Sequence, residues 1–153
     1  MKVVALDYGE RHVGIAMTDD EGALALRHRT IDTRSEDALG VVGEIVRDER
    51  VQLVLVGVPR NLDGEETQQS QQIRQFTSEL ERYFSNLRGL TSKVSIEMID
   101  ETLTSVEAEE NLQREGVPVS GVHAESARIM LDDYLRTSQT FEVRPPRFEV
   151  GRI

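Results

Sequence analysis

The sequence opens with an apolar strand and the turn that ends it, Lys2-Val-Val-Ala-Leu-Asp-Tyr-Gly9. The run from Val3 to Asp7 lacks the polar–apolar alternation of a strand with one exposed face, so we expect it to be covered on both sides. A carboxylate at the end of such a strand loses its water, which costs free energy unless a cation meets it. Asp-x-Gly is also ordinary turn chemistry. Asp7 is therefore either a turn residue or a ligand that holds a metal ion at the middle of a sheet.

The composition indicates a single globular domain. The chain has 153 residues, 38% of them hydrophobic, and no cysteine, which excludes disulfides, zinc–thiolate sites and thiol nucleophiles. It contains no apolar stretch long enough to span a bilayer, and we expect a cytoplasmic protein without membrane contact. A net charge of −10 argues against nonspecific coating of nucleic acid, but it permits an enzyme with a local basic face and divalent ions.

Hydrophobic patterning predicts the order β-β-β-α-β-α-β-α-α. Three short strands to residue 31 form an antiparallel meander, and later strands at 51–57 and 93–99 are separated by helices, including one over 65–86. Strands joined through helices should be parallel. We therefore expect an α/β domain over residues 1–138, with a mixed five-stranded sheet flanked by helices. Residues 139–153 are expected to form an extended or mobile tail.

Three predicted strand ends carry chemistry: Asp7, the loop 59–64, and the pair Asp100-Glu101. Ligands of such sheets bind at the carboxyl ends of the parallel strands. Carboxylates gathered there repel one another unless cations intervene, and Mg²⁺ or Mn²⁺ prefers such oxygen ligands. Metal ions at this edge could activate water for phosphodiester hydrolysis.

Four motifs resemble those of the YqgF (RuvX) family, small proteins with the ribonuclease H fold that are related to Holliday-junction resolvases. In chain order they are Asp7-Tyr-Gly-Glu-Arg-His-Val-Gly-Ile-Ala16, Val56-Gly-Val-Pro-Arg-Asn-Leu-Asp-Gly64, Asp100-Glu-Thr-Leu-Thr-Ser105 and Ser126-Ala-Arg-Ile-Met-Leu-Asp-Asp-Tyr-Leu135. The resemblance covers the chain up to Leu135. It implies a ribonuclease H-like fold and a nuclease dependent on Mg²⁺ or Mn²⁺ that matures the 5′ end of pre-16S ribosomal RNA.

The resemblance also implies the site. Asp7 would be the first metal ligand and Glu101 the second, with Asp100 beside it; neighbouring strand positions face opposite ways, and we rank Glu101 first. The family's third acid falls on His123, which is then a candidate ligand and catalytic residue. Thr102 stands where the family usually has arginine.

Five further residues are candidates for binding substrate: Gly9, Arg11, Arg60, Asn61 and Asp63. Each has a structural alternative, as a turn former or an ordinary surface charge. Inside the second strand, Gly14 is expected to be structural, permitting a close approach of neighbouring backbone. His12 is expected at the surface.

Helix geometry separates His123 from the nearest acid, Glu125. Residues step about 100° around a helix axis, which places His123 about 40° from the centre of the sheet-facing side of the last helix. Glu125 then points nearly opposite, and we expect it in solvent. His123 could bind a metal through a ring nitrogen or donate a proton to the leaving group; it could also be a packed or capping histidine.

Three alternatives remain on sequence alone. The protein could cleave branched DNA, as a Holliday junction resolvase does. It could be a weakly catalytic or non-catalytic nucleic-acid-binding relative. It could also be a nucleotide-binding domain of the actin and sugar-kinase kind, although that fold needs two such domains. Expected partners are precursor ribosomal RNA, branched DNA and ribosomal particles, with the protein as a monomer or weak homodimer.

Overall fold

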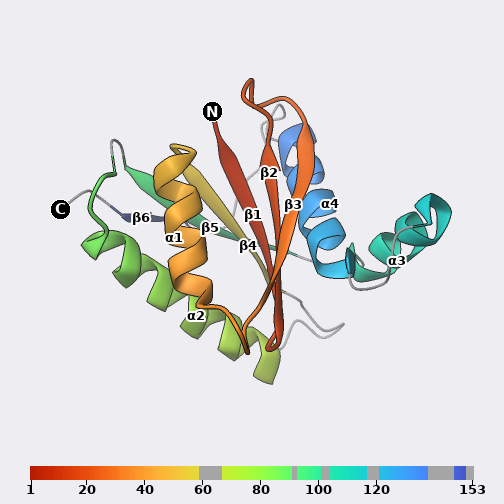
Figure 1. The fold of residues 1–153 in the computed structure, drawn as a ribbon, viewed down its shortest axis with the longest axis horizontal. Helices are drawn as coiled ribbons and strands as arrows, with labels where there is room; N and C mark the ends of the chain where they lie inside the picture. Colours follow the sequence, from red (N-terminus) through yellow and green to blue (C-terminus); the bar gives the residue numbers. More distant parts are fainter. Residues whose placement is uncertain (59–66, 91–92, 101–103, 117–120, 138–146, 151–153) are drawn as a thin grey trace.

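The structure is a computed structural model that describes residues 1–58, 67–90, 93–100, 104–116, 121–137 and 147–150. Its elements alternate largely as the sequence predicts (Figure 1). In chain order they are β1 (Val3–Tyr8), β2 (His12–Thr18), β3 (Ala25–Asp32), α1 (Ala38–Asp48), β4 (Leu53–Val58), α2 (Gln68–Asn86), β5 (Val94–Asp100), α3 (Thr104–Glu115), α4 (Val122–Thr137) and β6 (Arg147–Val150).

One sheet runs through the molecule in the order β3-β2-β1-β4-β5-β6. The first three strands form the predicted antiparallel meander, and β1, β4 and β5 are parallel neighbours. The prediction of five strands is one short, because β6 pairs antiparallel with β5 inside the expected tail. The four residues of β6 are too few to show a strand periodicity in the sequence. They form a strand because the edge of β5 offers unpaired backbone groups for hydrogen bonding.

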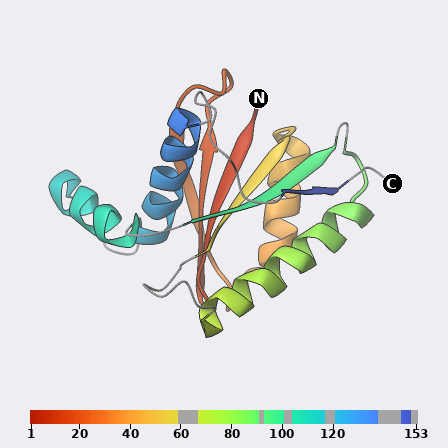
Figure 2. The same cartoon turned by 180° about the vertical axis from the view of Figure 1, so that it is seen from behind.

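Helices cover both faces of the sheet (Figures 1 and 2). Helices α1 and α2 lie on one face, while α4 lies on the other and α3 packs against α4. Along β1 the side chains alternate: Val4 and Leu6 enter the core under α1 and α2, whereas Val3 and Ala5 enter the core under α4. Both faces are thus buried, as the unbroken apolar run of this strand predicts.

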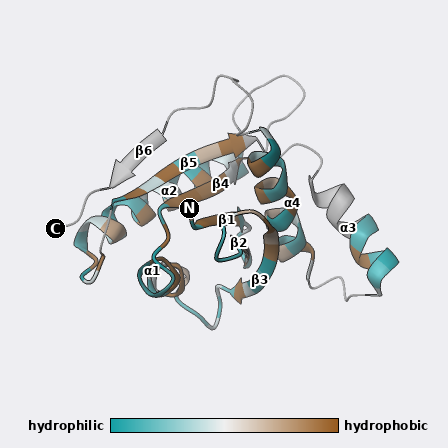
Figure 3. Ribbon diagram, turned by 90° about the horizontal axis from the view of Figure 1, so that it is seen from above, coloured by the Kyte–Doolittle hydropathy of each residue, from teal (hydrophilic) through white to brown (hydrophobic). Residues whose placement is uncertain are grey.

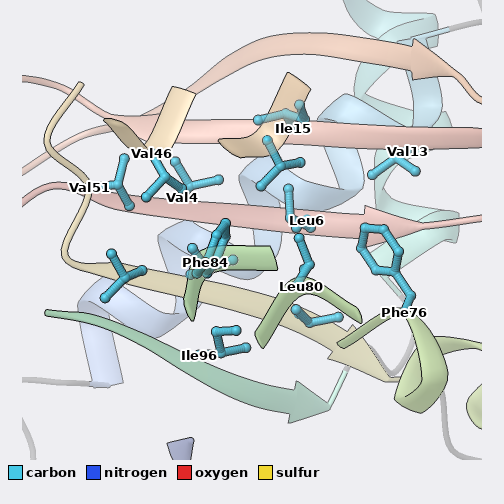
Figure 4. Close-up of a cluster of buried hydrophobic side chains, with 14 of the residues drawn as sticks. Val4, Leu6, Val13, Ile15, Val46, Val51, Phe76, Leu80, Phe84 and Ile96 are labelled. Carbon is cyan, nitrogen blue, oxygen red and sulfur yellow. The ribbon is translucent and has the colours of Figure 1, made fainter. Parts of the chain in front are cut away.

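The larger core lies between the sheet and the two helices α1 and α2, and Figure 4 shows its side chains converging from both layers. Figure 3 shows the matching hydrophobic stretches along β4 and β5. Helix α2 contributes Ile73, Phe76, Leu80 and Phe84 at helical spacing. It begins at Gln68 rather than at 65, because Thr67 caps it by accepting a hydrogen bond from the backbone N–H of Ser70.

None of the helices in the described parts of the chain is both long and apolar enough to cross a bilayer.

Candidate active site

Asp7 is buried near the carboxyl end of the central strand β1. Its side chain is 8% exposed, and the residue pairs in register with Gly14 of β2. Its two chain neighbours in β1 belong to the opposite core face, so Asp7 lies on the face that α4 covers. A carboxylate in this position needs a partner.

The partner is His123, in the first turn of α4. Its Nδ1 lies 3.2 Å from Oδ2 of Asp7, across 116 residues of sequence. The hydrogen bond to Asp7 and the charge of that carboxylate raise the pKa of His123 above 6.5, although partial burial opposes the rise. The prediction that His123 faces the strand ends is confirmed, and a positive charge on its ring can meet Asp7 directly.

Gly14 allows this contact. A Cβ added there would lie 2.0 Å from both the carbonyl carbon and the carbonyl oxygen of His123. No side chain fits in that space, so the backbone of α4 rests directly on β2. The structural interpretation of Gly14 is confirmed, with a helix as the element that approaches.

Gly9 closes the turn after β1 and leaves room for the imidazole. Its N–H donates to the carbonyl oxygen of His12 at 2.8 Å. A Cβ at Gly9 would lie 2.9 Å from that oxygen and 3.1 Å from Cε1 of His123. The glycine therefore shapes the wall around His123; its suggested contact with substrate stays a prediction.

His12 is not the surface residue that we expected. It is half-buried at the start of β2, and its ring stacks on that of His123, with centroids 5.7 Å apart and planes at 28°. The local sequence does not predict this contact, because it depends on where α4 begins to cross β2.

Glu125 corrects a second expectation, because it is fully buried rather than in solvent. Arg128 binds both of its carboxylate oxygens, at 2.6 and 2.7 Å, and Asn111 of α3 donates to it at 2.9 Å. Arg27 of β3 lies 3.6 Å away. The step of about 100° per residue places Glu125 on the side of α4 away from the sheet, but α3 covers that side. The spacing of Glu125 and Arg128, three residues apart on a helix, was the available signal.

Several predicted site residues lie outside the described residues: Glu101 and Thr102 after β5, and Arg60, Asn61 and Asp63 after β4. The backbone of Asp100 ends β5, in register with Val58. Arg11 is exposed, two residues beyond Gly9, and its carbonyl oxygen accepts a hydrogen bond from the N–H of Thr33. The roles predicted for all these residues are untested.

The donors at Asp7 fit a divalent cation. The described parts of the chain hold no group of three or more His, Cys, Asp or Glu that could bind one, so a further ligand would have to come from elsewhere. However, Oδ2 of Asp7 and Nδ1 of His123 are 3.2 Å apart, close to the roughly 3 Å between neighbouring ligands at 2.1 Å in an octahedral shell. A nitrogen in that pair suits Mn²⁺ better than Mg²⁺.

The meander followed by parallel strands, with an acid at the end of the central strand, defines a ribonuclease H-like α/β protein. Two solved structures share this fold. RuvC of Thermus thermophilus in complex with a Holliday junction substrate has a TM-score of 0.58 and 13% identity, covering 95% of this chain and 99% of that one. The fowlpox virus resolvase in complex with Holliday junction DNA has a TM-score of 0.56 and 9% identity, covering 92% and 100%.

The chain belongs to the RuvX family, whose model is described as Holliday junction resolvase and matches residues 1–137. A relative in Maridesulfovibrio salexigens is 30% identical over 88% of this chain and 98% of its own length. Another in Syntrophus aciditrophicus is 36% identical over 77% of this chain and 74% of its own length. Both carry the provisional name of pre-16S rRNA nuclease. The resemblance of the four motifs is thereby confirmed.

Proposed function

We propose that this protein is a divalent-metal-dependent nuclease that hydrolyses phosphodiester bonds in structured nucleic acid, most directly at the 5′ end of pre-16S ribosomal RNA. One observation carries the proposal: Asp7, buried at the end of the central strand, meets a titratable imidazole at 3.2 Å in a chain of the RuvX family. The names of the relatives support the RNA substrate.

Asp7 and His123 would hold the metal, together with Glu101. Odd-numbered positions of β5 share the face of Asp7, since Ile99 packs in the core under α4. Because side chains alternate along a strand, we assign the next ligand to Glu101 rather than to Asp100. When bound, Mg²⁺ or Mn²⁺ lowers the pKa of water and neutralises charge on the phosphate.

His123 has two ways to take part, and they use different atoms. Through Nδ1 it would share a cation with Asp7. When Nδ1–H donates to Asp7 instead, Nε2 is available to give a proton to the leaving oxygen. Arg11, exposed beside the turn, is suited to contact a phosphate, as is the predicted residue Arg60. Asn61 and Asp63 stay predicted substrate-binding residues without an assigned contact.

A second candidate substrate is branched DNA. It is favoured by the description of the family model and by the likeness to resolvase folds. A weakly catalytic nucleic-acid-binding protein is the third candidate, since His123 replaces an acid and Thr102 replaces an arginine of the family pattern.

The test is incubation of the purified protein with ribosome-associated precursor RNA and with a four-way DNA junction, each in Mg²⁺ and in Mn²⁺. We expect cleavage of the RNA, faster in Mn²⁺, and none with Asp7→Asn. Cleavage of the junction alone would replace the substrate assignment. Binding of either nucleic acid without cleavage would leave only the non-catalytic alternative.

A further inference from the structure

We infer that His12 is a positioning residue, whose ring holds the His123 imidazole in the orientation that keeps Nδ1 at Asp7. The inference rests on the proposed function only for its effect on cleavage; the orientation itself is a property of the metal-free protein. The family resemblance assigns no role to His12, and the sequence alone predicted that this residue lies at the surface.

The backbone beneath the His123 ring is fixed, but the ring is not. Contact with Gly14 leaves no space for α4 to shift towards β2. The side chain still turns about its own bonds, and the outer torsion of histidine has two broad, nearly equivalent minima. A half-turn there exchanges Nδ1 for a carbon and breaks the contact with Asp7.

A single hydrogen bond is a weak restraint at this place. The side chain of His123 is 37% exposed, so water competes for Nδ1 at its distance of 3.2 Å from Asp7. The wall at Gly9 limits the edge near Cε1, but not the ring face. Something has to cover the face if one orientation is to dominate.

His12 covers it from a rigid base. As the first residue of β2 it pairs with Asp32 of β3, and its carbonyl oxygen accepts the Gly9 N–H at 2.8 Å. Its ring lies near-parallel to that of His123, at a centroid distance within the usual range for stacked aromatic pairs. Such a stack should change the ratio of Asp7-bound to released orientations by about twofold to tenfold.

The chain offers a clean experiment because it has three histidines, and the remaining one, His28, is exposed on β3. Nitrogen NMR of ¹⁵N-histidine-labelled, metal-free protein, at one fixed pH, reports which ring nitrogen of His123 carries a proton. We expect the ratio of Asp7-bound to released His123, read from its Nδ1–H signature, to fall in His12→Ala by that twofold to tenfold factor. His12→Phe should restore it, and His28→Ala should leave it unchanged.

A cleavage assay adds the second measurement. His12→Ala should lower kcat, by at most that factor, with KM unchanged, and His12→Phe should recover it. If the alanine variant unfolds, His12→Gln replaces it, since glutamine keeps a polar side chain but has no aromatic face. An unchanged His123 signature in these variants would overturn the inference.

Two further outcomes decide the point. Loss of the signature in both His12→Ala and His12→Phe would mean that His12 acts through its ring nitrogens, and positioning by stacking would be wrong. If wild-type protein cleaves no substrate yet the signature follows the aromatic ring, the proposed function fails while the positioning role stands.

Discussion

Asp7 and Glu125 are buried carboxylates that α4 contacts, and they differ in the kind of cation that meets them. Glu125 is bound by Arg128 on both oxygens and by Asn111, with Arg27 nearby. Asp7 is met by His123 through one hydrogen bond of 3.2 Å. A guanidinium is always charged, whereas an imidazole loses its charge within the physiological range.

The difference separates a structural acid from one that can exchange its partner. Glu125 connects α4 with α3 and β3, and both of its carboxylate oxygens accept hydrogen bonds. Asp7 lies at a strand end with a titratable partner, which a divalent cation would join or displace under the proposed function. Both acids are buried, so burial does not distinguish the proposed metal ligand from the structural acid, whereas the permanence of the counter-charge does.

The largest expected effect is on cleavage. Asp7→Asn should reduce the rate at least about a hundredfold, because even residues that merely orient metal ligands cost tenfold to a hundredfold when they are removed. Glu125→Gln, the matched buried acid, should keep its rate per folded molecule, measured well below its melting temperature. An Asp7→Asn variant that still cleaves, with contaminating nuclease excluded, would end the assignment of Asp7.

Stability should respond in the opposite order. Glu125→Gln leaves two arginines without their carboxylate and should lower the free energy of unfolding by about 2–3 kcal/mol, less than for fully buried pairs because both arginines keep some water. Asp7→Asn should cost less than about 1 kcal/mol at pH 8, since His123 is more than a third exposed. Urea unfolding measures both; equal losses would remove the contrast between the two acids.

Metal should stabilise the native state, because the ligands are assembled only in the folded chain. Mn²⁺ at about a hundred times its dissociation constant should raise the melting temperature by about 5–10 °C in wild type and in Glu125→Gln. Asp7→Asn should show no rise. A rise of the same size in Asp7→Asn would mean that the ion binds elsewhere on this acidic protein. His123→Asp should move the preference from Mn²⁺ towards Mg²⁺, since it replaces nitrogen by oxygen.

The smallest effect is a pH dependence that belongs to Glu125. Burial by itself would raise the pKa of this carboxyl, but the hydrogen bonds from Arg128 and Asn111 and the arginine charges outweigh it and hold the pKa below 4.5. A lowered folded-state pKa gives stability that is present above about pH 4.5 and is lost as the pH falls through the folded value. The gap in unfolding free energy between wild type and Glu125→Gln should therefore narrow in acid. A gap that stays constant down to pH 3 would show that Glu125 is not the group that titrates.

The sequence by itself predicted the order of the elements up to the last helix, the burial of Asp7 and the direction of His123 towards the sheet. These follow from periodicities that act over a few residues: unbroken apolar runs for strands covered on both faces, and about 100° per residue around α4. The four motifs added the family and with it the fold. Glu101, Arg60, Asn61 and Asp63 remain predictions because they lie outside the described residues.

Tertiary structure alone decided three other points: the pairing of β6 with β5, the stack of His12 on His123, and the burial of Glu125. The prediction from helix geometry considered only the sheet as a neighbour of α4, and it therefore placed the opposite side of the helix in water. Helix α3 packs against α4 here, and Asn111 of α3 donates a hydrogen bond to Glu125. Which other element packs on the second side of a helix depends on the tertiary fold, and the hydrophobic periodicity of the helix itself does not predict it.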